Sequence, residues 1–388
     1  MRDKARLRTI FALVAVLALV AAACGDDDAG TTTTVAATTA TTSAPATTAA
    51  PATTAAPAET SAPQPEFADF NGDGKVVIGV ATDGARDDGS YYQTLVETIE
   101  EISAANGFEP PIIVDLIDPA NADAELEALA QQGVDVIAVG SSAIAEGLPA
   151  LALEYDEIYW YCNCGSGSPA TEGIMKSSDS GAELWISGGY AAGLLLQDAG
   201  GDTAVFIGCC DLNFEVESFN GFILGLQMVD PSFTATYVPT GNFPFDFNNT
   251  AGATEAYATA LAEGVDLVVP FLGDAHEPIV RLANEDGLIV MTVGPSNGCE
   301  RDDLDYDFLV KFSAGDYVRP VFDDILSGVA VEGGIRNFTV GIDDEVGAEF
   351  CDGATAAQVD MLDALNAQIG AGDFGDEIFA ILSDAYGF

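Results

Sequence analysis

The sequence predicts an α/β protein built from two doubly wound lobes, each around a parallel sheet. From Lys75 onward, short β-branched runs alternate with helical patterns, and strands separated by helices favour right-handed crossovers. The segment 128–137 recurs at 260–268, and each copy ends a helix, places a glycine at its cap and enters an apolar strand through an aspartate. The two copies lie about 130 residues apart, which indicates two lobes of ordinary domain size. Ligands of such folds sit at the carboxyl ends of strands, so we expect a central cleft where the lobes face each other.

Residues 1–23 have the features of an export signal. Four of the twelve cations precede an apolar run, Ile10–Ala23, which as a helix would span about 21 Å, short of a hydrocarbon core of about 30 Å. Small residues then stand directly before Cys24. This resembles the lipobox of bacterial lipoproteins, in which the cysteine is lipidated, although Ala21 replaces the usual leucine. The alternative is an ordinary signal peptide with an incidental cysteine.

Residues 24–66 are expected to be the anchor cysteine and a tether. The segment 29–66 is rich in Thr, Ala and Pro and has no hydrophobic period, so it cannot offset the entropy of ordering. A flexible coil of this length reaches about 30–35 Å, which would let an anchored domain work off the membrane surface.

The two-lobed domain is expected over residues 67–388. The first lobe takes about 75–183 and the second about 184–296, and each also takes part of 297–388. A helix is expected from Ser90 to Ala105, because apolar residues recur on one face. The expected strands are 75–81, 112–116, 134–139, 157–161, 203–208, 234–238, 265–271, 288–293 and 308–312.

The charge balance excludes nucleic acid as a partner. The chain has 62 acidic and 12 basic residues, a formal charge of −50, so it repels phosphates. Apolar residues still make up 48% of the chain, enough for a large core. The excess of acidic residues is consistent with a strongly solvated surface, a saline environment or an acidic wall. The sequence alone does not distinguish these three explanations. The single histidine excludes a His-rich metal site.

The loop after the first strand is the best candidate site, because it follows a buried strand and opens a helix. Its carboxylates can accept hydrogen bonds from a ligand, and its first tyrosine can stack on a ring. The alternative is that Asp88 or Ser90 only caps the helix while Tyr91 packs on the core. The candidate residues are Asp83, Asp87, Asp88, Ser90, Tyr91 and Tyr92.

A second candidate segment ends the corresponding strand of the second lobe and contains Gly273, Asp274 and His276. His276 either donates to a ligand across the cleft or lies on the first turn of a surface helix. No G-x-S-x-G elbow accompanies the histidine, so no hydrolase triad is indicated and we expect no enzyme. Residues 69–74 resemble the start of an EF-hand loop, but the twelfth position is Val80 rather than a glutamate, which favours a solvated turn over a calcium site.

Three motifs together resemble the basic membrane protein family of ABC-transporter substrate-binding lipoproteins. They are Thr82-Asp83-Gly84 with Asp87-Asp88-Gly89-Ser90-Tyr91-Tyr92, the helix Gly189-Tyr190-Ala191-Ala192-Gly193, and Phe219-Asn220-Gly221-Phe222-Ile223-Leu224-Gly225. The resemblance covers roughly residues 75–350. It implies a type I periplasmic-binding-protein fold with two lobes, three hinge crossovers and a ligand clamped between the lobes.

Characterised members of this family bind purine nucleosides, and their contacts carry over only in part. Tyr91 corresponds to the aromatic residue that stacks on the base, and Phe219 to a second aromatic residue. Asn163 lies where the family's fourth strand ends in aspartate. The resemblance therefore implies a ring-bearing ligand.

The family's ribose contacts are missing. The position of the family's acidic residue is occupied here by Pro295 or Ser296, and that of its lysine lies near Ala314. The lysine of this sequence, Lys311, comes three residues earlier. We therefore expect a polar solute other than the common nucleosides.

The six cysteines besides Cys24 are expected to form disulfides, as is usual outside the cytoplasm, with their connectivity left open. Cys162/Cys164 and Cys209/Cys210 are expected at strand ends in opposite lobes, where a bond between lobes would lock the hinge. Four thiolates around a soft metal are the alternative.

These observations predict an extracytoplasmic, lipid-anchored solute-binding protein that delivers a small polar molecule to an ABC permease in the cell membrane. No cofactor, metal or nucleic acid is expected. The alternative is an anchored ligand sensor or surface interaction module on the same fold.

Overall fold

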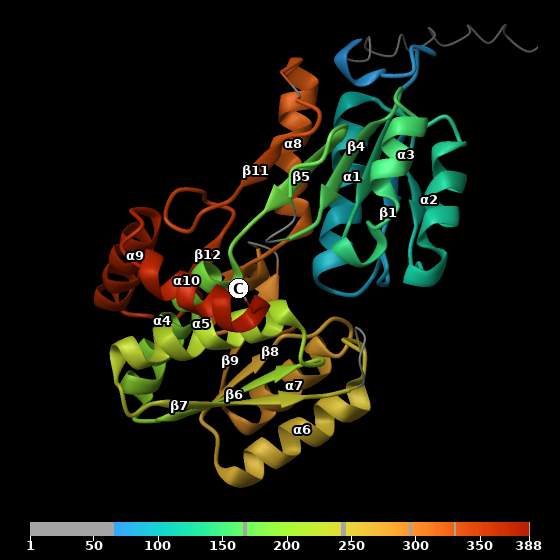
Figure 1. The fold of residues 1–388 in the computed structure, drawn as a ribbon. Helices are drawn as coiled ribbons and strands as arrows, with labels where there is room; N and C mark the ends of the chain where they lie inside the picture. The colour runs from blue at the N-terminus through green and yellow to red at the C-terminus, as the bar shows by residue number, and fades with distance from the viewer. Residues whose placement is uncertain (1–65, 166–168, 242–245, 295–296, 330, 388) are drawn as a thin grey trace, which may run out of the picture. The chain divides into compact units, whose positions relative to one another are not determined.

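In the computed structural model, the described part of the chain forms two mostly parallel sheets with helices on both faces (Figure 1). The structure describes residues 66–165, 169–241, 246–294, 297–329 and 331–387. The expected export signal, Cys24 and nearly all of the expected tether therefore lie outside the described residues. In the described ranges, no helix combines the length and apolar character needed to cross a bilayer.

The first sheet has the strand order β11-β5-β4-β3-β1-β2, with every neighbouring pair parallel. Its strands are β1 Ile78–Ala81, β2 Ile112–Val114, β3 Val136–Val139, β4 Tyr159–Asn163, β5 Ile174–Ser178 and β11 Ile335–Asn337. Helices cover both faces, so the strands are apolar on both sides. We call this sheet and its helices the first lobe: α1 Tyr91–Asn106, α2 Ala122–Ala130, α3 Leu148–Glu154 and α8 Ala314–Ser327, with short helices η1 Glu66–Ala68, η2 Pro119–Asn121 and η3 Ser142–Ile144.

The second sheet repeats this order as β12-β10-β9-β8-β6-β7, and only its edge strand β12 is antiparallel. Its strands are β6 Thr203–Gly208, β7 Thr234–Pro239, β8 Leu267–Pro270, β9 Ile289–Gly294, β10 Phe308–Lys311 and β12 Gly347–Phe350. We call this sheet and its helices the second lobe: α4 Gly181–Ala199, α5 Asn213–Val229, α6 Thr250–Glu263, α7 His276–Asp286, η4 Gly298–Glu300, α9 Ala356–Gly370 and α10 Gly375–Tyr386. Helices α9 and α10 pack against α4 and α5 (Figure 1).

The sequence repeat has the same structural role in both lobes. The Asp135 carboxylate accepts the backbone N–H of Val77 at 2.8 Å, just before β1, and Asp266 accepts the N–H of Thr203 at 3.1 Å, at the start of β6. Each aspartate directly precedes one strand and bonds the start of the neighbouring strand. The two segments of the repeat therefore belong to equivalent βαβ units, as predicted.

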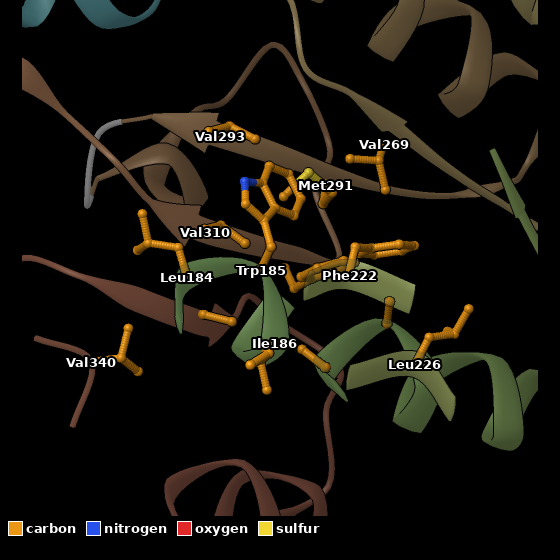
Figure 2. Close-up of a cluster of buried hydrophobic side chains, with 14 of the residues drawn as sticks. Leu184, Trp185, Ile186, Phe222, Leu226, Val269, Met291, Val293, Val310 and Val340 are labelled. Atoms are coloured by element: carbon orange, nitrogen blue, oxygen red, sulfur yellow. The ribbon is translucent and has the colours of Figure 1, made fainter. Parts of the chain in front are cut away.

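Glycines let α4 and α5 pack with their backbones in contact. A Cβ on Gly189 would overlap the carbonyl oxygen of Phe222, and one on Gly225 would overlap the carbonyl oxygen of Ile186. The core of the second lobe forms beside this contact. Figure 2 shows Trp185 projecting from α4 among Met291, Val293 and Val310, and Trp185 is 2% exposed.

Three crossovers within the described residues connect the lobes: β5 to α4, β10 to α8, and β11 to β12. One side chain on α8, Tyr317, contacts a residue of each. Its hydroxyl donates to Asp179 at 2.8 Å, its ring stacks on Phe338 at 4.5 Å, and it meets Phe312 edge-on at 6.1 Å. The three crossovers therefore converge on one aromatic residue.

The nine expected strands are all present, with ends that differ by a few residues. Strands β5, β11 and β12 were not expected. They are short and mixed in polarity, with burial that ranges from buried to exposed, and they have neither an apolar run nor a clean alternation to reveal them. Residues 69–74 form the expected turn, in which the Asn71 side chain accepts the N–H of Asp73 and Asp69 accepts that of Gly74, both at 3.0 Å.

Candidate ligand-binding site

A stacked pair of aromatic rings lies where the carboxyl ends of strands from both lobes come together. Tyr91 is in the first turn of α1, and Phe312 directly follows β10 in the crossover to α8. Their centroids are 5.1 Å apart with planes inclined by 22°, and both side chains are only partly buried. Burial raises the pKa of the Tyr91 hydroxyl, and the nearby carboxylate of Asp179 acts in the same direction. The pair is an aromatic surface that a planar ring can contact.

Hydroxyl groups orient Asp83 beside this pair. Its Oδ1 accepts hydrogen bonds from the hydroxyls of Tyr92 and Ser141, both at 2.7 Å. Burial and Asp83 together raise the pKa of Tyr92, which keeps that hydroxyl a donor. The loop after β1 and the loop after β3 are thus joined through one carboxylate. Tyr92 acts on the site by holding Asp83.

Asp88 and Ser90 have structural roles. The Asp88 carboxylate accepts the backbone N–H groups of Ser90, Tyr92 and Gln93 at 3.0, 3.2 and 3.0 Å, so it caps the start of α1. Burial raises its pKa, although these hydrogen bonds oppose the shift. The Ser90 hydroxyl donates to the carbonyl of Val293 at 3.3 Å and so joins α1 to the end of β9. The capping alternative therefore holds for Asp88.

Asn163 ends β4 and is 2% exposed, and its Nδ2 has no hydrogen-bond partner among the described residues. Side chains along β4 alternate between the two faces of the sheet, so Asn163 lies on the same face as Tyr161. Its partner on the neighbouring strand β5 is Ser177. Tyr161 and the partly buried Tyr91 belong to the same apolar cluster on that face. A buried amide without a partner costs free energy, so this donor is suited to an acceptor that arrives with a ligand.

Asp179 follows β5 at the neighbouring strand end. Its Oδ2 accepts the Tyr317 hydroxyl, and burial raises its pKa to about 6, with the Glu217 carboxylate adding to the shift. The sequence analysis did not include Asp179. The sequence feature that could have indicated Asp179 is the helix start directly after it, where the Ser180 side chain accepts a hydrogen bond from the N–H of Glu183 at 3.3 Å.

The second lobe adds aromatic rings at its own strand ends. Phe271 follows β8 and meets Phe312 edge-on at 6.5 Å, and Phe214 and Phe247 lie beside it at 6.2 and 6.3 Å. All four phenylalanines are partly exposed. Sequence analysis missed them as site residues, although Phe271 and Phe312 end expected strands.

Three residues that were predicted to contact the ligand have partners elsewhere in the protein: Phe219, His276 and Lys311. Phe219 packs in the core of the second lobe against Phe206 at 5.7 Å and Tyr237 at 5.6 Å. The ring that stacks on Tyr91 is instead that of Phe312, which follows β10 in the crossover to α8.

His276 begins α7 and is 2% exposed. Its Nδ1 bonds with the Pro270 carbonyl at 2.8 Å and its Nε2 with the Tyr306 hydroxyl at 3.2 Å, and burial lowers its pKa. Both ring nitrogens are thus used within the protein. Lys311 pairs with Glu349 on β12 at 3.4 Å, and both line a hollow of about 470 Å³ against α9 rather than the aromatic pair.

Asp87, Gly273 and Asp274 lie at the margin of the site. Asp87 and Asp274 are exposed, and burial together with the charge of Asp87 raises the pKa of Asp274. The N–H of Gly273 donates to the Phe247 carbonyl at 3.1 Å. The two carboxylates are therefore close enough to repel each other across the two loops.

The six described cysteines pair within each lobe, so no disulfide joins the lobes across the hinge in the described residues. This also removes the alternative of four thiolates around a metal. The pairs are Cys162–Cys164, Cys209–Cys210 and Cys299–Cys351.

Two lobes of the same strand order, joined by three crossovers and carrying aromatic and polar groups at the strand ends, define a type I periplasmic-binding-protein-like fold. Solved structures show the same fold. An ABC transporter solute-binding protein from Conexibacter woesei shares 17% identity over 77% of this chain and 97% of its own, with a TM-score of 0.60. One from Aeropyrum pernix shares 14% over 80% and 99%, with a TM-score of 0.63. A transcriptional activator of the comK gene from Bacillus halodurans shares 18% over 76% and 98%, with a TM-score of 0.59.

The chain belongs to the Bmp family of PnrA-like ABC transporter substrate-binding proteins, whose family model matches residues 75–296. No curated protein matches the sequence significantly. Members of the family are solute-binding proteins rather than enzymes, which confirms the predicted fold class and the prediction of a non-enzymatic role. Membership implies a small-molecule ligand, a membrane permease as partner and an extracytoplasmic or membrane-associated location.

Proposed function

We propose that this chain is a lipid-anchored solute-binding protein of an ABC importer that captures a small polar, ring-bearing molecule by lobe closure. The observation that carries the proposal is the stack of Tyr91 on Phe312 at 5.1 Å, at the strand ends of both lobes. A ligand ring between them needs about 3.5 Å on each side, so the pair must separate by about 2 Å. Binding would then select a lobe arrangement in which both rings contact the ligand.

Native mass spectrometry of the purified protein tests this proposal. We expect a co-purified small molecule, and Tyr91→Ala should weaken its binding by about 1–3 kcal/mol, or roughly 5- to 150-fold, through lost burial and stacking. Tyr155→Ala is the matched control, because Tyr155 lies at the end of α3 and its hydroxyl accepts from Gln131 at 3.1 Å. Equal affinities of Tyr91→Ala and the parent protein would remove the stack from the site.

We also propose that the ligand is not a common nucleoside. A ribose in a closed site needs its hydroxyls paired, because each unpaired buried group costs about 1–3 kcal/mol. Of the positions where relatives supply these contacts, Pro295 and Ser296 lie outside the described residues, and Ala314 is a buried residue at the start of α8. Adenosine, guanosine and inosine should show no micromolar binding by calorimetry. Micromolar or tighter binding of any one would contradict the proposal.

A further inference from the structure

The basic residues of the described ranges form no ion pair with the carboxylates beside the aromatic pair. Six of the eight form ion pairs with carboxylates other than Asp83 and Asp179: Lys75, Arg86, Arg281, Arg301, Lys311 and Arg319. Lys176 donates to the Pro169 carbonyl at 2.8 Å. Arg336 lies 5.1 Å from the centre of the Phe338 ring, and its buried Nε has no hydrogen-bond partner among the described residues. No lysine or arginine in these ranges forms an ion pair with Asp83 or Asp179.

Those two carboxylates therefore have neutral partners only. Oδ1 of Asp83 accepts hydrogen bonds from two hydroxyl groups, and no described residue forms a hydrogen bond with its Oδ2. Asp179 accepts a hydrogen bond from the Tyr317 hydroxyl at 2.8 Å, and the Glu217 carboxylate repels its charge. Asp83 bonds the hydroxyl of Tyr92, whose ring meets that of Tyr91 edge-on at 5.2 Å. Asp179 bonds the hydroxyl of Tyr317, whose ring meets that of Phe312 edge-on at 6.1 Å, so each carboxylate is one side chain away from the aromatic pair. Buried or half-buried charges of this kind are normally paired.

The amide of Asn163 is an independent sign of a ligand. Asn163 is 2% exposed, and its Nδ2 has no hydrogen-bond partner in the part of the chain that the structure describes. It lies at the end of β4, between the strands that precede Ser141 and Asp179. An N–H donor needs an acceptor such as a carbonyl or hydroxyl oxygen. Among the described residues, Asp83 and Asp179 are thus not paired with a cation, and the Asn163 N–H donor is not paired with an acceptor.

The aromatic pair and the overall field favour the same kind of ligand. Tyrosine and phenylalanine faces attract cations, with more effect where water is excluded. The formal charge of −50 draws cations toward the protein and repels anions.

We infer that the ligand is a cationic ring compound that also carries a hydrogen-bond acceptor, held by Tyr91 and Phe312 at its ring, by Asp83 and Asp179 at its charge, and by Asn163 at its acceptor. This inference rests on the proposed solute-binding function and narrows its ligand class. It excludes anionic solutes.

A charge-matched series tests the inference on the full-length protein, refolded to remove any co-purified solute. The probes are 1-methylnicotinamide, nicotinamide and nicotinate, which share one ring and carry charges of plus one, zero and minus one at pH 7.5. We expect 1-methylnicotinamide to bind at least tenfold more tightly than nicotinamide, and nicotinate not to bind. Asp179→Asn should abolish the preference for the cation. Asp156→Asn, which removes an equal charge from an exposed position, should leave it unchanged.

The outcomes separate this inference from the proposed function. If nicotinamide binds as tightly as the cation and Tyr91→Ala removes that binding, the cation inference fails and solute binding stands. The cation inference also fails if Asp156→Asn lowers the preference as much as Asp179→Asn. If no probe binds, the solute found by native mass spectrometry decides: a cation supports the inference and a neutral or anionic solute overturns it. If no probe binds and no solute is found, both fail.

Discussion

Glu215 links the stability of the second lobe to pH. It is fully buried, and its two carboxylate oxygens accept the backbone N–H groups of Cys209 at 2.7 Å and Cys210 at 3.0 Å. Tyr237 also donates to it at 3.3 Å. Burial raises the pKa of Glu215 from its ordinary value of 4.5 to about 7, although these hydrogen bonds oppose the shift.

The sign follows from proton binding. Between about pH 4.5 and 7 the folded protein holds a proton that the unfolded chain has released, so stability falls as pH rises. The contribution is fully present below the unfolded pKa and is lost as pH passes the folded one. Raising the pKa from 4.5 to about 7 corresponds to about 3 kcal/mol, or about 6 °C in Tm at roughly 2 °C per kcal/mol for a large domain.

Thermal unfolding of the parent protein and Glu215→Gln from pH 4.5 to 8.5 measures this contribution. The amide cannot accept both backbone N–H groups, so the variant should lose about 1–3 kcal/mol at acid pH. Because it has no buried charge to form, its deficit should shrink as pH rises. Glu255→Gln, at an exposed position on α6, should keep the parent's pH dependence. Parallel Tm curves for the parent and Glu215→Gln would refute the reasoning.

Two further predictions concern the anchor and the helix packing. Cys24→Ser should release the protein into the soluble fraction, because the proposed lipid anchor needs the thiol; continued membrane association would contradict lipidation. Gly189→Ala should destabilise the protein by about 1–3 kcal/mol in urea unfolding, because the new Cβ overlaps a carbonyl oxygen of α5. Gly375→Ala, where a Cβ meets nothing within 4 Å, is the matched control, and an equal effect of the two changes would contradict the packing argument.

Much of the fold follows from local sequence pattern. Buried parallel strands are continuous apolar runs, and Gly133-Val134-Asp135 with Gly264-Val265-Asp266 mark equivalent strand entries, so the elements and the two-lobe division can be predicted from short windows. The strands with mixed polarity could not be predicted, because β11 and β12 pair with strands that are distant in the sequence, and β5 pairs with β11 on one side.

The sequence by itself also determined that the loop from Asp83 to Tyr91 belongs at a strand end, and that the chain repels nucleic acid. Only the tertiary structure decided which side chains meet there. Phe312 lies 221 positions from Tyr91 in the sequence, and it reaches that ring because a crossover returns the chain from the second lobe to the first. Whether a polar side chain serves the fold or a ligand likewise depends on its partners. The Asp88 carboxylate accepts hydrogen bonds from three backbone N–H groups, whereas Nδ2 of Asn163 has no partner among the described residues. Sequence periodicity reports the environment of a residue over a few neighbouring positions. Its hydrogen-bond and packing partners can lie hundreds of residues away in the sequence, and only the tertiary structure brings them together.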